Sequence, residues 1–155
     1  MGSSAHSIDV QIVSKLRAIP GARAFRNWLR SALPQPSDLT IRIVNAAEGR
    51  NLNSAFRGKD YATNVLTFVY HEKKAARLMG DIVLCAPVVV REAREQGKSL
   101  EAHYAHLTVH GALHLAGMNH ENAREAKAME RKEATILNAL GFANPYAEDS
   151  EGQAR

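Results

Sequence analysis

One segment of the chain carries three histidines at a spacing suited to metal chemistry. His110 and His114 are four residues apart, so on a helix their imidazoles lie one turn apart on the same face and can share one metal ion. Gly117 follows three residues later, where glycine can end a helix in the left-handed conformation. The chain can then fold back and bring in His120. Three imidazoles with an open fourth position are typical of a catalytic zinc, so we expect a hydrolytic metal centre.

Two further histidines, His103 and His106, precede this segment and compete as ligands. His106 lies one turn upstream of His110 on the same helical face. Only His110 and His114 are followed by the glycine turn and a third histidine. We therefore predict His110, His114 and His120 as the ligands of one Zn²⁺ per chain. His103 and His106 are expected in the pocket wall or partly exposed.

The residue after the first ligand argues against peptide hydrolysis. The ligand spacing equals that of long zinc-peptidase motifs, in which a glutamate after the first histidine deprotonates the zinc-bound water. Here that position is Gly111. Loss of a general base costs roughly 10²–10⁴-fold in rate. A zincin-like metallopeptidase is therefore a disfavoured alternative.

The composition is that of one globular domain. The chain has 155 residues, 45% of them hydrophobic and 23% charged, which is ordinary for a folded domain of this size. We expect residues 1–155 to form a single domain with frayed ends at 1–6 and 148–155. No apolar run reaches the roughly 18–20 residues of a membrane helix, and the start of the chain is too polar for a signal peptide. No membrane partner is expected.

Charge and cysteine content add weaker indications. The formal net charge is +4, which fits an anionic partner such as nucleic acid without requiring one. The single cysteine, Cys85, lies in an apolar run, so it cannot form an intramolecular disulfide and is expected to be a buried thiol in a reducing compartment.

Periodicity predicts the elements that position these residues. Alternating or continuous apolar runs predict strands at 8–13, 39–44, 65–70 and 80–85, the last two as antiparallel neighbours. Helical spacing predicts helices at 22–33, 46–55, 87–96, 103–116 with Ser99 as its cap, and 124–140. The polar segment from Phe56 to Asn64 is expected to be a loop. The order β-α-β-α-β-β-α-α-α predicts an α+β fold with one mixed sheet of about four strands and about five helices.

Three blocks, in order, carry a family resemblance. They read Leu52-Asn53-x-x-Phe56-Arg57-x-Lys59-Asp60-x-x-Thr63-Asn64-Val65-Leu66-x-Phe68, then Gly80-Asp81-Ile82, then His110-Gly-x-Leu-His-Leu-x-Gly-x-x-His120. Together they resemble the YbeY family of bacterial endoribonucleases, which take part in ribosomal RNA maturation. The parts of the chain before and after these blocks carry no motif.

The resemblance implies a function and partners. It implies a zinc-dependent, single-strand-specific endoribonuclease acting in 16S rRNA 3′-end maturation, ribosome biogenesis and ribosome quality control in the cytoplasm. Its partners would be single-stranded RNA, ribosomal RNA and the small ribosomal subunit, with ribosomal proteins and a ribosome-associated GTPase as further candidates. The family's zinc ligands fall on His110, His114 and His120, and its functional arginine on Arg57. Asn119 stands where the family usually has aspartate.

Arg57 suits this chemistry because a guanidinium can hold a phosphate through two parallel hydrogen bonds, which a lysine cannot. The alternative interpretation of Arg57 is a surface salt bridge with Asp60 or a nearby acid. For the whole chain, a ribosome-assembly binding protein with a mainly structural metal is a further alternative.

Overall fold

The computed structural model describes residues 6–146, in which four strands and five helices follow one another in the predicted order. They are β1 (His6–Ile12), α1 (Ala22–Ala32), β2 (Ser37–Val44), α2 (Ala46–Arg57), β3 (Val65–Val69), β4 (Leu78–Cys85), α3 (Ala86–Gln96), α4 (Leu100–Leu115) and α5 (Ala123–Ala139). The predicted α+β fold is confirmed. Of the ends expected to be frayed, His6 begins β1, and residues 1–5 and 148–155 lie outside the described range.

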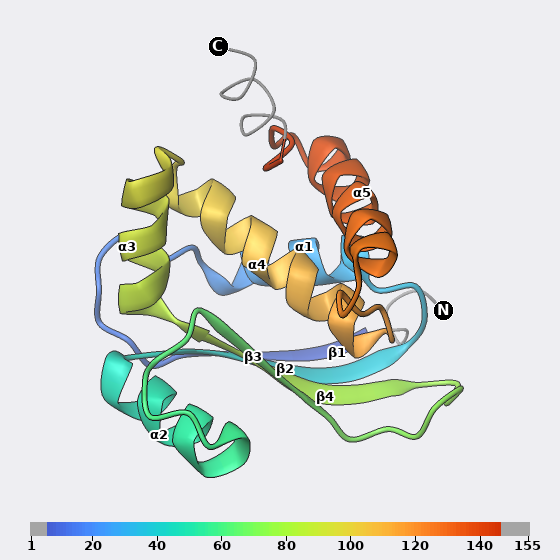
Figure 1. Ribbon diagram of the computed structural model, residues 1–155, viewed down its shortest axis with the longest axis horizontal. Helices are drawn as coiled ribbons and strands as arrows, with labels where there is room; N and C mark the ends of the chain where they lie inside the picture. The colour runs from blue at the N-terminus through green and yellow to red at the C-terminus, as the bar shows by residue number, and fades with distance from the viewer. Residues whose placement is uncertain (1–5, 147–155) are drawn as a thin grey trace.

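The four strands form one mixed sheet in the order β1-β2-β4-β3. β1 and β4 both run parallel to β2, whereas β3 pairs antiparallel with β4. The antiparallel pairing of the last two strands was predicted from the sequence. Because β3 lies at one end of this order, its outer edge has no partner strand within residues 6–146 and is called the free edge (Figure 1).

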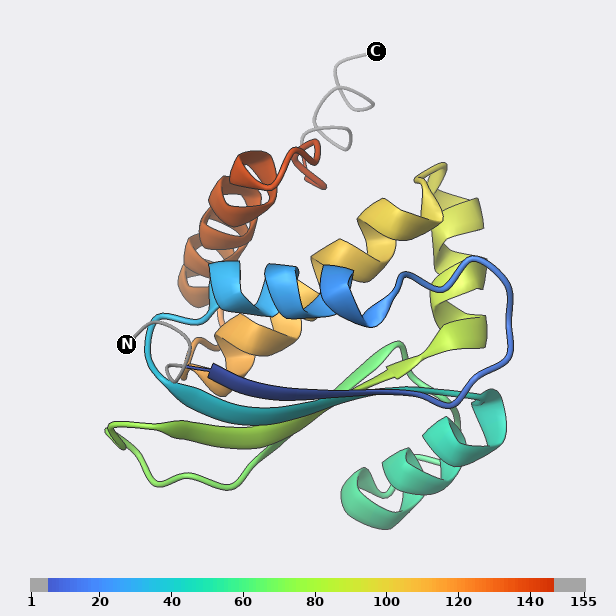
Figure 2. The same cartoon turned by 180° about the vertical axis from the view of Figure 1, so that it is seen from behind.

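Helices cover the two faces of the sheet unequally. Helices α1, α3, α4 and α5 lie on one face and α2 lies alone on the other (Figures 1 and 2). Strand β2 explains how both faces are filled, because Leu39, Ile41 and Ile43 enter the large core under the four helices. Val44 instead joins the smaller apolar cluster on the α2 side, which also contains the buried Cys85.

Helix α4 lies at the centre of the large core. It contacts the sheet as well as α1, α3 and α5, and most of its residues from His103 onward are buried. Ser99 caps its first turn as predicted, since the Ser99 hydroxyl accepts a hydrogen bond of 3.1 Å from the backbone N–H of Ala102. A helix held on so many sides gives its side chains well-defined positions. Within residues 6–146, no helix is long and apolar enough to cross a membrane.

Candidate active site

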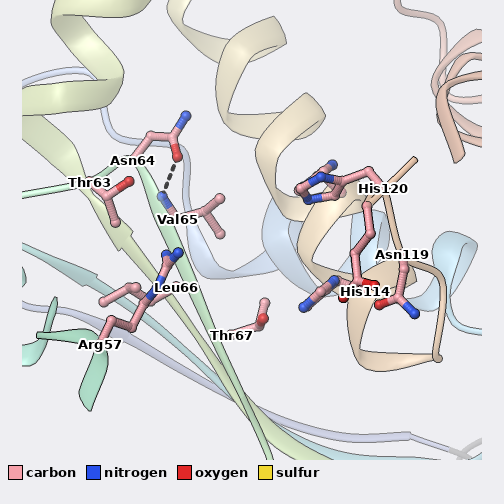
Figure 3. Close-up of a pocket in the computed structure, with 11 residues that line it drawn as sticks. Arg57, Thr63, Asn64, Val65, Leu66, Thr67, His114, Asn119 and His120 are labelled. Atoms are coloured by element: carbon pink, nitrogen blue, oxygen red, sulfur yellow. Dashed lines mark hydrogen bonds between the residues drawn. The ribbon is translucent and has the colours of Figure 1, made fainter. Parts of the chain in front are cut away.

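A cavity of about 450 Å³ opens beside the free edge of β3, and it collects the predicted site residues. Its walls come from the end of α2, the start of β3, the second half of α4 and the segment that follows α4 (Figure 3). The residues that line it are Arg57, Thr63, Asn64, Val65, Leu66, Thr67, His110, His114, Asn119, His120 and Glu121.

The end of α4 turns the chain back as the sequence predicted. Gly117 has φ = 102°, in the left-handed region that other residues rarely adopt. Its N–H donates to the carbonyl of His114 at 3.0 Å, and the N–H of Met118 donates to the carbonyl of Leu113 at 3.0 Å. These two bonds form a Schellman motif. The reversal brings His120 back beside the helix, with its ring centre 5.4 Å from that of His110 and 6.1 Å from that of His114.

These spacings can be compared with those of a zinc site. Two imidazoles that each lie about 2 Å from a shared tetrahedral zinc have ring centres roughly 5–5.5 Å apart. The observed 5.4 and 6.1 Å are close to that range. Even so, residues 6–146 contain no group of three His, Cys, Asp or Glu side chains already arranged to hold a metal ion. By residue type the three histidines fit zinc, and their rings would have to move closer together on binding.

His114 adds an observation of its own. Its Nδ1 atom is buried and has no hydrogen-bond partner among the described residues, although buried polar atoms are normally paired. Burial lowers the pKa of His114, and the neighbouring His110 lowers it further. Both effects favour the neutral imidazole, which is the form that binds metals.

His110 is held from behind by a residue that the sequence analysis missed. Its Nδ1 lies 2.7 Å from Oε2 of Glu133 in α5. The other carboxylate oxygen, Oε1, lies 2.9 Å from Nε2 of His106 and accepts a hydrogen bond from the Tyr146 hydroxyl. Burial of Glu133 opposes its ionisation, but these hydrogen bonds outweigh burial and lower its pKa to about 2.

A signal for Glu133 was present in the sequence. Glu133 lies four residues after Met129 and four before Leu137, so it occupies the same helical face as two core residues. A glutamate on such a face is almost never fully buried unless it is paired. Its two histidine partners, His106 and His110, lie on α4, far away in the sequence, and the spacing alone could not identify them.

The prediction for His103 was wrong. His103 does not line the cavity and is only 2% exposed, because it packs in the core between α3 and α4. Its Nε2 lies 2.9 Å from Oε1 of Glu92, and burial lowers its pKa. His106 also lies outside the cavity lining but is partly exposed, as one of the two predicted positions allowed.

Arg57 lies on the opposite wall of the cavity from the histidines (Figure 3). The predicted loop position was wrong, because α2 continues to Arg57 and ends only where Gly58 adopts the left-handed conformation. The alternative salt bridge with Asp60 was also wrong. Asp60 pairs instead with Arg50, at 2.8 and 3.0 Å, and none of the ion pairs formed within residues 6–146 includes Arg57. An exposed guanidinium therefore faces the cavity without an ion-pair partner among the described residues.

Sequence comparison is consistent with this arrangement. A family model described as Endoribonuclease YbeY matches residues 13–141. The chain belongs to the YbeY family. Three similar proteins, each named Endoribonuclease YbeY, illustrate the range of coverage. The protein of Azoarcus sp. is 57% identical, with 84% of this chain and 54% of that protein aligned. The proteins of Aromatoleum aromaticum and Methylibium petroleiphilum are each 58% identical, with 83% and 91% of this chain and 82% and 93% of those proteins aligned.

A solved structure shares the fold. The solution structure of TM1509 from Thermotoga maritima is 25% identical to this chain and superposes with a TM-score of 0.61, covering 94% of this chain and 93% of the other. The chain thus spans nearly the whole length of that structure and of some YbeY relatives, and about half the length of the Azoarcus protein.

Proposed function

We propose that this protein is a zinc-dependent, single-strand-specific endoribonuclease, with His110, His114 and His120 as the metal ligands and Arg57 as the phosphate-binding residue. One observation carries the proposal: a single cavity is lined by the three histidines and, opposite His114 and His120, by an arginine that has no ion pair within residues 6–146. Membership of a family whose relatives are named endoribonucleases supports it.

The proposed roles follow from charge. A phosphodiester under attack gathers negative charge, and fixed positive groups beside it stabilise the transition state. Arg57 can donate two parallel hydrogen bonds to a phosphate and so orient the scissile group. A zinc ion held by the histidines would supply further positive charge and Lewis acidity at the same phosphate.

The packing of α4 argues against the peptidase alternative. Gly111 occupies the position of the peptidase glutamate, and a Cβ atom there would lie 3.1 Å from Cγ2 of Ile82 in β4. The position therefore faces the sheet, and it is buried. A catalytic base has no room there, so the chain lacks both the glutamate and the space for one.

The remaining alternative is an RNA-binding assembly factor with a structural metal. A structural zinc is usually held by four protein ligands, whereas the three histidines here line an open cavity. This difference favours the enzyme. We further propose a cytoplasmic role in 16S rRNA 3′-end maturation, ribosome biogenesis and quality control, with the small ribosomal subunit, ribosomal proteins and a ribosome-associated GTPase as partners.

The test uses the purified full-length protein and two measurements. Elemental analysis should find one zinc per chain in the wild type and almost none in a His110→Ala, His114→Ala double variant. His71→Ala is the control, because His71 is a partly exposed histidine that does not line this cavity. Unstructured RNA should be cleaved by the zinc-loaded protein and spared after chelation, while casein is spared throughout. Bound zinc with no chelator-sensitive RNA cleavage would favour the assembly-factor alternative.

A further inference from the structure

Within residues 6–146, Glu133 is the one carboxylate that is hydrogen-bonded to any of the three cavity histidines. It is 1% exposed and lies on the inner face of α5. Its Oε2 is 2.7 Å from Nδ1 of His110, the nitrogen on the opposite side of the ring from Nε2. Burying a carboxylate costs several kcal/mol unless it is well paired. The three protein donors around Glu133 offset this cost, and the question is what the buried carboxylate does.

The hydrogen-bond directions around Glu133 can be traced from Lys98. The Nζ atom of Lys98 lies 3.3 Å from Nδ1 of His106, and an ammonium group can only donate. Nδ1 of His106 therefore accepts, and Nε2 of His106 carries the proton that it donates to Oε1 of Glu133 at 2.9 Å. The Tyr146 hydroxyl donates to the same oxygen. Oε1 thus has two donors, and Oε2 is left for His110.

This arrangement determines which nitrogen of His110 is protonated. An ionised carboxylate only accepts hydrogen bonds, so Nδ1 of His110 must carry the proton. A neutral imidazole has only one N–H, which leaves the lone pair on Nε2. A lone pair on Nε2 is what a metal ion requires of that nitrogen.

We propose that Glu133 is a positioning residue of the metal site: it fixes the orientation and the tautomer of His110, so that Nε2 is ready to bind the metal. That this orientation serves metal binding rests on the proposed function. The orientation and the tautomer of His110 themselves follow from the contacts of Glu133. Lys98, His106 and Tyr146 act one step further away, by orienting the carboxylate.

The competing explanation is that Glu133 only fastens α5 to α4. The fold supplies a matched control for that role in Glu92, which binds Nε2 of His103 at 2.9 Å and links α3 to α4. Both pairs join a glutamate on one helix to a buried or half-buried histidine on α4. Only the Glu133 pair involves a proposed ligand.

Glu133→Gln separates the two explanations. A glutamine amide has one accepting oxygen and one donating NH₂. Two donors, from His106 and Tyr146, compete for its oxygen against the single donor of His110, so the NH₂ group is expected to face His110. Nδ1 of His110 must then accept, and its proton moves to Nε2, where it blocks metal binding.

The tautomers can be read in the metal-free protein by long-range ¹H–¹⁵N NMR, at a pH above the ordinary histidine value of about 6.5. In the wild type, His110 should be protonated on Nδ1, and in Glu133→Gln on Nε2. Protonation of Nε2 in the wild type would overturn the proposal without any variant. An unchanged tautomer in folded Glu133→Gln would overturn it as well.

The second measurement is zinc affinity by chelator competition, with Zn²⁺ alone and no RNA. Loss of such a carboxylate partner typically lowers metal affinity 10–100-fold, and we expect that range for Glu133→Gln. Glu92→Gln should lose stability and keep wild-type affinity. Equal losses of zinc affinity in both variants would show that Glu133 only holds α5 against α4. A wild type that binds no zinc would instead refute the proposed function, and the tautomer measurement would still stand.

Discussion

Gly111 of α4 packs directly against Ile82 of β4, and a Cβ atom on Gly111 would lie 3.1 Å from Cγ2 of the isoleucine. The glycine thus lets the helix that carries the histidines lie close to the sheet, which has fully buried Ile82 at this point. The position after the first histidine serves packing here, whereas zinc peptidases use it for their catalytic base.

Two substitutions of Gly111 should therefore differ sharply. In Gly111→Ala, a gain in helix propensity of about 1 kcal/mol is offset by crowding against Ile82, so the free energy of unfolding should change by less than about 1 kcal/mol. Gly111→Glu must bury an unpaired carboxylate and should lose at least about 2 kcal/mol. Denaturant unfolding measures both. Gain of casein hydrolysis in a stable Gly111→Glu protein would contradict the packing argument.

Asn119 gives a second prediction. It is exposed, lines the cavity and precedes His120, at the position where the resemblance to the family implies an aspartate. An asparagine can hydrogen-bond, but it brings no negative charge to a zinc ion bound beside it. Asn119→Asp should therefore fold normally and bind Zn²⁺ at least as tightly as the wild type, as measured by chelator competition. A large loss of zinc would show that this site is built around the neutral amide.

Local signals in the sequence located much of this site. Ser99 and Gly117 act through hydrogen bonds to residues within five positions, so the start and end of α4 could be predicted from neighbouring residues. His120 followed from the same turn. The alternation of apolar and polar residues predicted the strands, because successive side chains of a strand point to opposite faces of the sheet.

Contacts between distant segments could not be located in this way. Glu133 meets His110 only because α5 packs on α4, and no spacing in the sequence encodes that pairing. His103 was misplaced for the same reason, since Glu92 on α3 satisfies it in the core. Arg57 was placed in a loop because the polar residues after it resemble one. The left-handed Gly58 ends the helix one residue later instead.

Buried His103 predicts sensitivity to acid. Burial lowers its pKa in the folded protein below the usual 6.5, so the unfolded chain takes up this proton first as the pH falls. Stability from this group is complete above about pH 6.5 and declines from there down to the folded-state pKa, by at most about 1.4 kcal/mol per pH unit. His103→Gln should flatten this part of the curve of unfolding free energy against pH. If the curves of the wild type and of His103→Gln run parallel, a group other than His103 causes the acid sensitivity.

The strongest prediction concerns Arg57 and its neighbour Arg50 on the same helix. Both are exposed arginines of α2, but Arg50 is paired with Asp60, whereas Arg57 faces the cavity. Arg57→Ala should keep its zinc and its melting temperature and should lose RNA cleavage by roughly 10²-fold or more, the scale of one transition-state charge partner. Arg57→Lys should recover only part of the rate, because an ammonium cannot make two parallel bonds. Arg50→Ala should cleave almost like the wild type, since an exposed ion pair contributes little.

Zinc content and cleavage rate on one unstructured RNA decide between a catalytic and a structural role for Arg57. Full activity in Arg57→Ala would make this residue a surface charge, and loss of zinc together with activity would make it a structural one.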